Sequence, residues 1–392
     1  MIPNKNTFCI APWFSVFIDS RKKLSPCCKS NNTNKYNYSQ LNDYFFSNEL
    51  EQLRKDLING IKNKTCSACW ETEEQNGDSL RKQYNRTLAM RFDKGSILNQ
   101  INNPSVKNIK SFDLVLGNLC NLKCIMCNPG LSSQLLAEAN LNPELKKWYT
   151  KNTTYNQKLF NWPEDNDFVN WCEKNLPQSI HIKFTGGEPF IIPGLHKIIE
   201  QIPDSQKKNC ILHFTTNLTN INKDILNYFT KFKEVWLSVS CEGIEETLEY
   251  VRFGHKWKTL DENFKIIQNM NSKNIILAVN YVVQALSYHS IIAMVKYFDS
   301  LKIKIDPIML SDPKHFHISS LTKYAKNKFI SDTKDYNGFN KSFVNFIRNM
   351  SKKYIDHDKS LSKKCIKHLE LLDKSRKTNY KKIIPFENLR QI

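Results

Sequence analysis

The stretch FDLVLGNLCNLKCIMC, residues 112–127, leads from an apolar run directly into three cysteines. Its first part, residues 112–117, is a short apolar run and predicts a buried strand. Cys120, Cys124 and Cys127 follow, with three and then two residues between them. Two thiols can cross-link, but three leave an odd one, so the spacing indicates a metal centre with one unfilled coordination position.

The same order of strand and amphipathic helix repeats downstream. The expected strands are residues 112–117, 180–184, 211–216, 235–240, 275–283 and 303–309. The stretches between them carry apolar residues three and four apart, which is typical of helices that bury one face. Strand, helix and strand in this order imply parallel strands with right-handed crossovers. We therefore expect an α/β fold, in the form of a partial (β/α)6 TIM-like barrel.

The chain of 392 residues is longer than a usual single domain, and its composition divides it into three segments. Residues 1–92 hold five cysteines and predict a small N-terminal module. Residues 107–310 form the predicted barrel, and DKGSILNQINNPSVKN, residues 93–108, is the expected connection. Residues 311–392 are rich in lysine and predict a basic helical C-terminal extension.

The net charge of +19 permits nucleic-acid binding, because clustered lysine and arginine release counterions from phosphates. The lysines are spread along the whole chain, however, so a solvated basic surface is the favoured interpretation. The N-terminus shows no secretory signal, and the apolar region 275–295 is interrupted by polar residues, which argues against a membrane span. A cytoplasmic protein is expected, with cysteines that serve as ligands, catalytic thiols or small buried side chains.

Further motifs follow the other predicted strands. In barrels of parallel strands the active site lies at the carboxyl ends of the strands. TGGEP, residues 185–189, follows the second strand, Asn217 follows the third and Ser240 closes the fourth. Two glycines after a strand usually form only a turn, but the agreement of several motifs with the cysteine triplet indicates one functional site.

Together these motifs resemble the radical S-adenosylmethionine (SAM) superfamily, over at least residues 112–310. The resemblance implies that Cys120, Cys124 and Cys127 hold three irons of a 4Fe-4S cluster, and that the fourth iron takes the amino and carboxylate groups of SAM. It implies reductive cleavage of SAM to a 5′-deoxyadenosyl radical, which abstracts hydrogen from a substrate. It also implies an electron donor such as flavodoxin or ferredoxin.

Four of the implied cofactor-binding residues lie in two motifs. Gly186 and Gly187 would let the backbone approach SAM closely, because glycine has no Cβ. The Glu188 carboxylate would receive the methionine ammonium. Met126 occupies a position where the family commonly packs an apolar residue near the adenine. The alternative interpretation is that Gly186 and Gly187 only form a turn.

Three further residues complete the implied SAM site. Asn217 and Ser240 match positions that bond polar groups of the cofactor. Arg252, in EYVRFG, resembles a family arginine that pairs with the methionine carboxylate, and a surface arginine is the alternative. Glu242 stands where the family usually has aspartate, so its contact with the ribose is not assigned.

The N-terminal cysteines resemble auxiliary-cluster modules known as SPASM and twitch domains. The expected ligands of a second 4Fe-4S cluster are Cys9, Cys27, Cys66 and Cys69. Cys28 could replace Cys27, and a zinc site is the alternative to iron-sulfur. The turn glycine of those modules is missing, because the fifth residue before Cys27 is Lys22.

The leading hypothesis is therefore a radical SAM enzyme with one auxiliary cluster, acting on a peptide or a small polar metabolite. Its reaction would be of the peptide-modifying or oxidoreductase type. The alternative is a non-enzymatic, zinc-stabilised RNA-binding protein, which leaves the cysteine triplet and TGGEP unexplained. Relatives with such motifs catalyse unlike reactions, so the substrate is not assigned.

Overall fold

A computed structural model describes residues 6–31, 35–152, 158–221, 223–270, 272–310 and 312–390. The chain forms two compact units, each described by itself below. The first comprises Met1–Gly117, Asn161–Phe214 and Asn227–Val235, and the second comprises Asn118–Phe160, Thr215–Leu226 and Trp236–Ile392. Parts of the predicted N-terminal and C-terminal segments, namely residues 1–5, 32–34, 311 and 391–392, lie outside the described residues.

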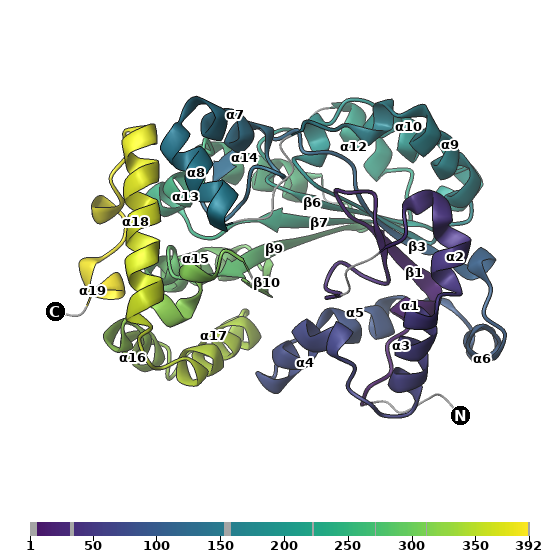
Figure 1. Cartoon of the computed structure of the whole chain (residues 1–392), viewed down its shortest axis with the longest axis horizontal. Helices are drawn as coiled ribbons and strands as arrows, with labels where there is room; N and C mark the ends of the chain where they lie inside the picture. The colour runs from purple at the N-terminus through teal and green to yellow at the C-terminus, as the bar shows by residue number, and fades with distance from the viewer. Residues whose placement is uncertain are drawn as a thin grey trace. The chain divides into compact units, whose positions relative to one another are not determined.

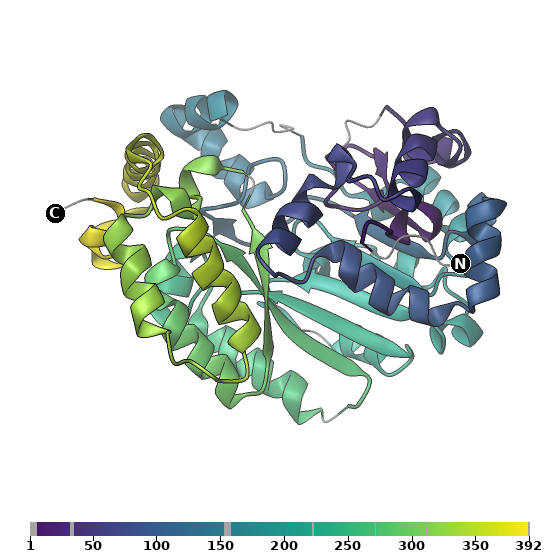
Figure 2. The same cartoon turned by 90° about the horizontal axis from the view of Figure 1, so that it is seen from below.

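A mostly parallel sheet forms the centre of the first unit. Its strands are β1 (Ser15–Ile18), β2 (Leu24–Ser25), β3 (Ser111–Val115), β5 (His181–Thr185) and β6 (Ile211–Thr216). Their order is β2-β1-β3-β5-β6, and only the β1–β2 pair is antiparallel. In both views the purple N-terminal segment lies beside the teal strands (Figures 1 and 2). Because β1 pairs with β3 in parallel, the N-terminal segment shares the sheet of the predicted barrel.

Among the described residues of the first unit, nine helices accompany this sheet, and an aromatic cluster packs on β5 and β6. The helices of the first unit are α1 (Ala11–Phe14), α2 (Leu41–Phe45), α3 (Asn48–Ile58), α4 (Ser67–Glu74), α5 (Leu80–Thr87), α6 (Lys94–Asn102), α9 (Asn166–Asn175), α10 (Leu195–Ile199) and α11 (Asp204–Lys207). Alternate strand residues point to opposite faces. Phe184 and Phe214 are fully buried, with ring centroids 5.6 Å apart, and Phe190 packs 5.0 Å from Phe214. This core fixes β5 and β6, from which two of the predicted motifs extend.

The second unit contains the remaining strands and a helical C-terminal region. Its strands β7 (Glu234–Ser240), β9 (Ile275–Val283) and β10 (Lys304–Met309) lie in that order, and a two-stranded ladder joins β4 (Lys123–Cys124) to β8 (Arg252–Phe253). The helices are α7 (Ser133–Leu141), α8 (Pro143–Asn152), α13 (Glu245–Val251), α14 (Trp257–Asn269), α15 (Ile291–Ser300), α16 (Lys323–Asp332), α17 (Lys341–Lys353), α18 (Lys359–Arg376) and α19 (Phe386–Leu389). The helix α12 (Lys223–Phe229) and the strands β6 and β7 have residues in both units.

The predicted fold class is confirmed, since all six expected strands are present and helices form the C-terminal region. Figure 1 shows α18 as a long yellow helix. The sequence pattern did not predict β1, because a strand of four residues is too short to show a period. The segment boundaries at 92 and 310 stay a prediction. Among the described helices, none has the length and apolar character needed to cross a membrane.

One buried amide anchors the N-terminal segment to the chain that leads into β3. Gln100 is fully buried, and its Nε2 donates to the carbonyl oxygens of Trp13 and Ser105, both at 2.9 Å. Its Oε1 accepts the backbone N–H of Ser105 at 3.0 Å and the Asn108 side chain at 2.7 Å. One side chain therefore satisfies polar groups that water does not reach.

We predict that Gln100→Ala lowers the free energy of unfolding by about 2–4 kcal/mol, because it leaves buried backbone groups without partners. Asn99→Ala changes an exposed residue of the same helix and should act within about 0.5 kcal/mol. Denaturant unfolding of both variants measures the difference. Equal stability of the two would show that the Gln100 bonds do not anchor this segment.

Candidate functional site

The three-cysteine loop is held by its own backbone bonds and by α7. The Ser133 hydroxyl accepts the N–H of Cys120 and donates to its carbonyl oxygen, both at 3.1 Å. The N–H of Cys127 donates to the carbonyl oxygen of Cys124 at 3.1 Å, which closes a turn around Met126. The loop thus places its cysteines before any ligand arrives.

The three thiols of the loop act on one another electrostatically. Burial raises the pKa of Cys127 to about 12, and neighbouring Cys124 and Cys120 add to the rise. Burial also raises the pKa of Cys124, against the opposing charge of Arg252. Buried thiolates of like charge are costly to bring together unless positive charge accompanies them. The iron ions of an iron-sulfur core would supply that charge, so this donor set fits the group that the sequence predicts.

The spacing of these side chains bears on the kind of metal group. Within the part of the chain that the structure describes, no three Cys, His, Asp or Glu side chains lie close enough to hold a single ion. A tetrahedral zinc with Zn–S bonds of about 2.3 Å would need sulfurs about 3.8 Å apart. A cuboidal cluster is bound at its separate corners, so it accepts thiolates that lie farther apart than this.

A buried ion pair lies against the middle cysteine. Cys124 of β4 pairs with Arg252 of β8, and Nη1 of Arg252 lies 3.5 Å from the Cys124 sulfur. Nε and Nη2 of Arg252 donate to the two carboxylate oxygens of Glu242 at 2.5 and 2.8 Å. Burial disfavours the guanidinium, but Glu242 and Cys124 outweigh it and raise the pKa of Arg252. Arg252 is therefore a cation at the loop, and a surface position is excluded because it is only 8% exposed.

The amide of Asn217 ties the end of β6 to the cysteine loop. Its Nδ2 donates to Oδ1 of Asn121 at 2.9 Å, and its Oδ1 accepts the Thr219 hydroxyl at 2.7 Å. Asn121 donates to the same hydroxyl at 2.7 Å, and His255 Nε2 lies 2.8 Å from the carbonyl oxygen of Asn217. Sequence reasoning missed Asn121, Thr219 and His255, since no spacing marks them. Ser240, by contrast, is the last residue of β7 as predicted.

The glycine motif follows β5 in the first unit. Gly186 and Gly187 have φ of +87° and +53°, which glycine adopts without strain. A Cβ on Gly186 would overlap the Val115 side chain and lie 2.8 Å from the carbonyl oxygen of Gly117. Glu188 is 1% exposed, and its Oε1 accepts the N–H of Phe190 at 3.2 Å. The motif is therefore a close-packed backbone turn with a buried carboxylate.

The N-terminal cysteines lie within electrostatic reach of one another in the first unit. Burial, with Cys69 next, raises the pKa of Cys66 to about 12. The pKa of Cys9 is raised by burial and, less strongly, by Cys66 and Cys69. Burial and then Cys28, Cys9 and Cys69 raise the pKa of Cys27. Cys27 is thus within electrostatic reach of the predicted ligand group.

Cys28 has different surroundings from Cys27. Burial raises its pKa, and the next contributions come from Lys183 and Asp113. These two residues pair across β3 and β5, with Nζ of Lys183 3.3 Å from Oδ2 of Asp113. Of the two adjacent cysteines, Cys28 therefore lies by an ion pair of the sheet.

The turn between β1 and β2 explains how the missing glycine is replaced. Lys22 has φ of +62°, the left-handed conformation that glycine usually supplies. Oδ1 of Asp19 accepts the N–H groups of Arg21 at 2.7 Å and Lys23 at 2.9 Å, which holds the turn. The Lys22 ammonium forms an ion pair with Asp165.

Arg81 is a cation beside the N-terminal thiols that sequence reasoning missed. Its guanidinium donates to the carbonyl oxygen of Phe8 at 2.8 Å and forms a 2.6 Å ion pair with Glu73. Its charge lowers the pKa of Cys9, against burial. Arg81 lies 73 residues from Phe8 in sequence, so only the folded chain brings it to these cysteines.

Comparison with known proteins gives matches to part of the chain. Residues 114–298 match the radical SAM superfamily. Over 216 residues the chain is 28% identical to an uncharacterized protein of Methanocaldococcus jannaschii. This alignment covers 53% of this chain and 65% of that protein. The match thus spans less than two thirds of the length of that relative.

Solved structures align with part of the chain. AnSMEcpe with bound AdoMet aligns at a TM-score of 0.40 and 16% identity, over 56% of this chain and 57% of that chain. SuiB of Streptococcus suis bound to S-adenosylmethionine aligns at a TM-score of 0.40 and 17% identity, over 72% and 62%. SuiB bound to its precursor peptide SuiA gives 0.40 and 15%, over 71% and 62%.

We predict that Gly186→Ala destabilises the chain by about 2–4 kcal/mol, because the new Cβ meets backbone and side chain at a left-handed φ. Gly95→Ala, at an exposed position in the first turn of α6, should act within about 1 kcal/mol. Thermal unfolding of both variants compares them. A Gly186→Ala protein as stable as Gly95→Ala would contradict the close packing of this turn.

Proposed function

We propose, because the chain carries a radical SAM domain at residues 114–298, that it is an enzyme which cleaves SAM reductively and abstracts hydrogen from a substrate. The observation that carries the proposal is the set of three neighbouring thiols inside the matched region, of which Cys124 is buried and Cys120 and Cys127 are half-buried. Their loop is fixed in advance by backbone bonds and lies against the Arg252 guanidinium.

The residues of the loop would hold a 4Fe-4S cluster, with one iron left for SAM. Bound there, cluster and SAM supply the reductive chemistry that yields the 5′-deoxyadenosyl radical. The residues of the chain orient the thiolates and compensate their negative charge. The Cys124–Cys127 turn sets the direction of two thiolates, and Arg252 offers positive charge that Glu242 keeps in place.

The SAM-binding residues remain as the sequence proposed them. Glu188 is a buried carboxylate suited to an ammonium group, and the turn at Gly186 and Gly187 leaves backbone groups without a Cβ in front of them. Met126 sits at the turn between the second and third cysteines. Asn217, Ser240 and Arg252 complete the proposed set. In this set the Arg252 guanidinium, which is paired with Glu242, would also attract the methionine carboxylate.

Cys9, Cys27, Cys66 and Cys69 are proposed as ligands of a second 4Fe-4S cluster. Their mutual electrostatic reach and the nearby Arg81 support an anionic thiolate group at this place. Cys27 is preferred to Cys28 because Cys28 adjoins Asp113 and Lys183. A cluster with four protein ligands has no open iron, so it suits electron transfer.

The substrate is proposed as a peptide or a small polar metabolite, with modification or oxidation as the outcome. Electrons would come from a donor such as flavodoxin or ferredoxin. The precursor peptide in the SuiB structure belongs to that protein. For this chain, the substrate class follows only from the proposed auxiliary cluster.

Replacing Cys124 by Ala should abolish the formation of 5′-deoxyadenosine, since two thiolates cannot hold the cluster in place. The matched control is Cys365→Ala, a fully buried cysteine of α18, which should retain the parent rate. The assay adds dithionite and SAM to anaerobically reconstituted protein and measures 5′-deoxyadenosine by chromatography. Product at the parent rate from Cys124→Ala would refute the cluster assignment.

Metal analysis distinguishes the two adjacent N-terminal cysteines. The parent protein should hold about eight irons per chain, and Cys27→Ala should hold about four, because one cluster loses a ligand. Cys28→Ala should keep the full content. If Cys28→Ala loses the iron and Cys27→Ala does not, the assignment is reversed. Zinc in place of iron at unchanged cysteines would support the structural alternative.

A further inference from the structure

The C-terminal helix α18 ends on a buried ion pair with the helix that follows the cysteine loop. Arg376, the last residue of α18, donates from Nε to Oε1 of Glu138 at 3.0 Å and from Nη2 to Oε2 at 2.7 Å. The two side chains are 1% and 5% exposed, and they lie 238 residues apart in sequence. A buried two-point pair of this kind has a definite geometry and excludes water.

The same carboxylate also reaches the cysteine loop. Nζ of Lys123 lies 3.5 Å from Oε1 of Glu138, and Lys123 directly precedes Cys124. Lys123 and Arg376 both lie 5.0 Å from the ring of Phe253, the residue after Arg252. Arg376 is thus joined to both strands of the β4–β8 ladder that carries Cys124.

One nitrogen of Arg376 is not used by this pair. Nη1 is buried and has no hydrogen-bond partner among the residues that the structure describes. A buried donor without a partner destabilises the folded protein, so we expect Nη1 to donate to an acceptor in the functional state. Arg376 contacts the Phe253 ring of the β4–β8 ladder, and Cys124 lies on the other strand of that ladder.

The charges at the ladder leave a positive excess. Lys123, Arg252 and Arg376 are the cations, and Glu138 and Glu242 are the carboxylates that bind them. A cluster held by three thiolates is anionic, and uptake of an electron increases its negative charge. A fixed positive charge beside it therefore favours the reduced form.

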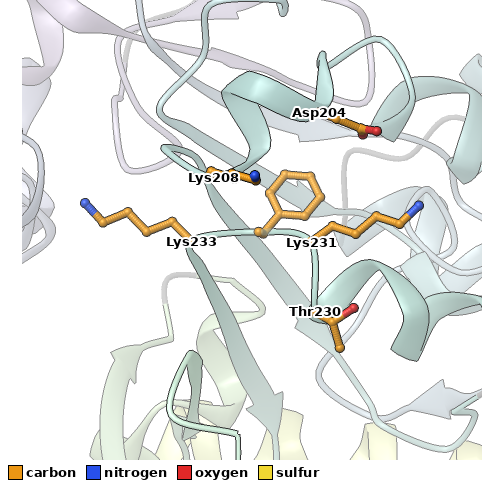
Figure 3. A pocket seen from close by; sticks show the side chains of 6 residues that line it. Asp204, Lys208, Thr230, Lys231 and Lys233 are labelled. Carbon is orange, nitrogen blue, oxygen red and sulfur yellow. The ribbon is translucent and has the colours of Figure 1, made fainter.

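Another group of lysines, around a pocket in the first unit, lacks a buried ion pair like that of Arg376 among the described residues. Figure 3 shows a pocket of about 530 Å³ in the first unit, lined by Lys208, Lys231 and Lys233. The Lys231 and Lys233 side chains extend away from each other in that view, so their charges do not meet at one point. Arg376, in contrast, is held by two hydrogen bonds in a buried position.

We propose that Arg376 is a charge-compensating residue of the cysteine loop, whose Nη1 donates to a thiolate or sulfide of the bound cluster and whose charge raises the cluster's reduction potential. Glu138 is its positioning residue. The C-terminal helix α18 is then part of the redox site rather than a separate extension. This inference rests on the proposed function, because it requires the cluster to be present.

The test is the midpoint potential of the cluster in the reconstituted full-length protein. The signal to follow is the electron paramagnetic resonance of the reduced cluster that changes when SAM is added, which identifies the loop cluster against the second one. Arg376→Gln should shift the midpoint to a more negative value, and Arg376→Lys should recover part of that shift. Lys374→Gln removes the same charge from the same helix at a 74% exposed side chain and should leave the midpoint unchanged.

A shift of the midpoint potential in the opposite direction is expected when Glu138, the ion-pair partner of Arg376, is changed. Glu138→Gln removes a negative charge while it keeps hydrogen-bonding capacity, so the midpoint should become less negative. This variant carries the test if Arg376→Gln fails to fold. Midpoints equal to the parent value in Arg376→Gln, or in Glu138→Gln when it alone folds, would overturn the inference. A parent protein without a SAM-responsive cluster would instead refute the proposed function itself.

Discussion

The buried pair between Arg252 and Glu242 is the interaction on which the cysteine loop depends. A guanidinium in this place would be costly alone, because it would lose water without gaining a counter-charge. Glu242 meets two of its nitrogens, and the third then lies 3.5 Å from the sulfur of Cys124. The short β4–β8 ladder brings Arg252 and Cys124 into register. A local backbone pairing thus places a cation at a thiol.

An arginine paired with a carboxylate also lies near the cysteines at two further places in the described structure. Arg376 is clamped by Glu138 next to the β4–β8 ladder, and Arg81 is clamped by Glu73 beside the N-terminal thiols. In each case a carboxylate fixes the guanidinium and a thiol group lies within reach of the remaining charge. Thiolates need positive charge in a buried place, and a paired arginine supplies it without leaving an isolated ion.

Much of the fold and part of the site could be read from the sequence. The six strands of the predicted barrel are present because their runs are long and rich in β-branched residues. The cysteine loop and the glycine turn are local, so spacing alone identified them. The ion pairs of Glu242, Arg376 and Arg81 were not identified, since their partners lie at least eight residues away and a lone charged residue usually marks a solvated surface. The four-residue strand β1 gave no periodic signal.

The sequence by itself determined the α/β fold and the loop of three thiols, because both follow from residue type at short spacing. Only the tertiary structure decided which charges accompany those thiols and how Cys27 and Cys28 differ. Adjacent residues share one sequence context, yet the backbone turns their side chains to different surroundings, one toward the cysteine group and one toward Asp113 and Lys183. Charge compensation acts through space, so it becomes visible only when residues as far apart as Glu138 and Arg376 have met.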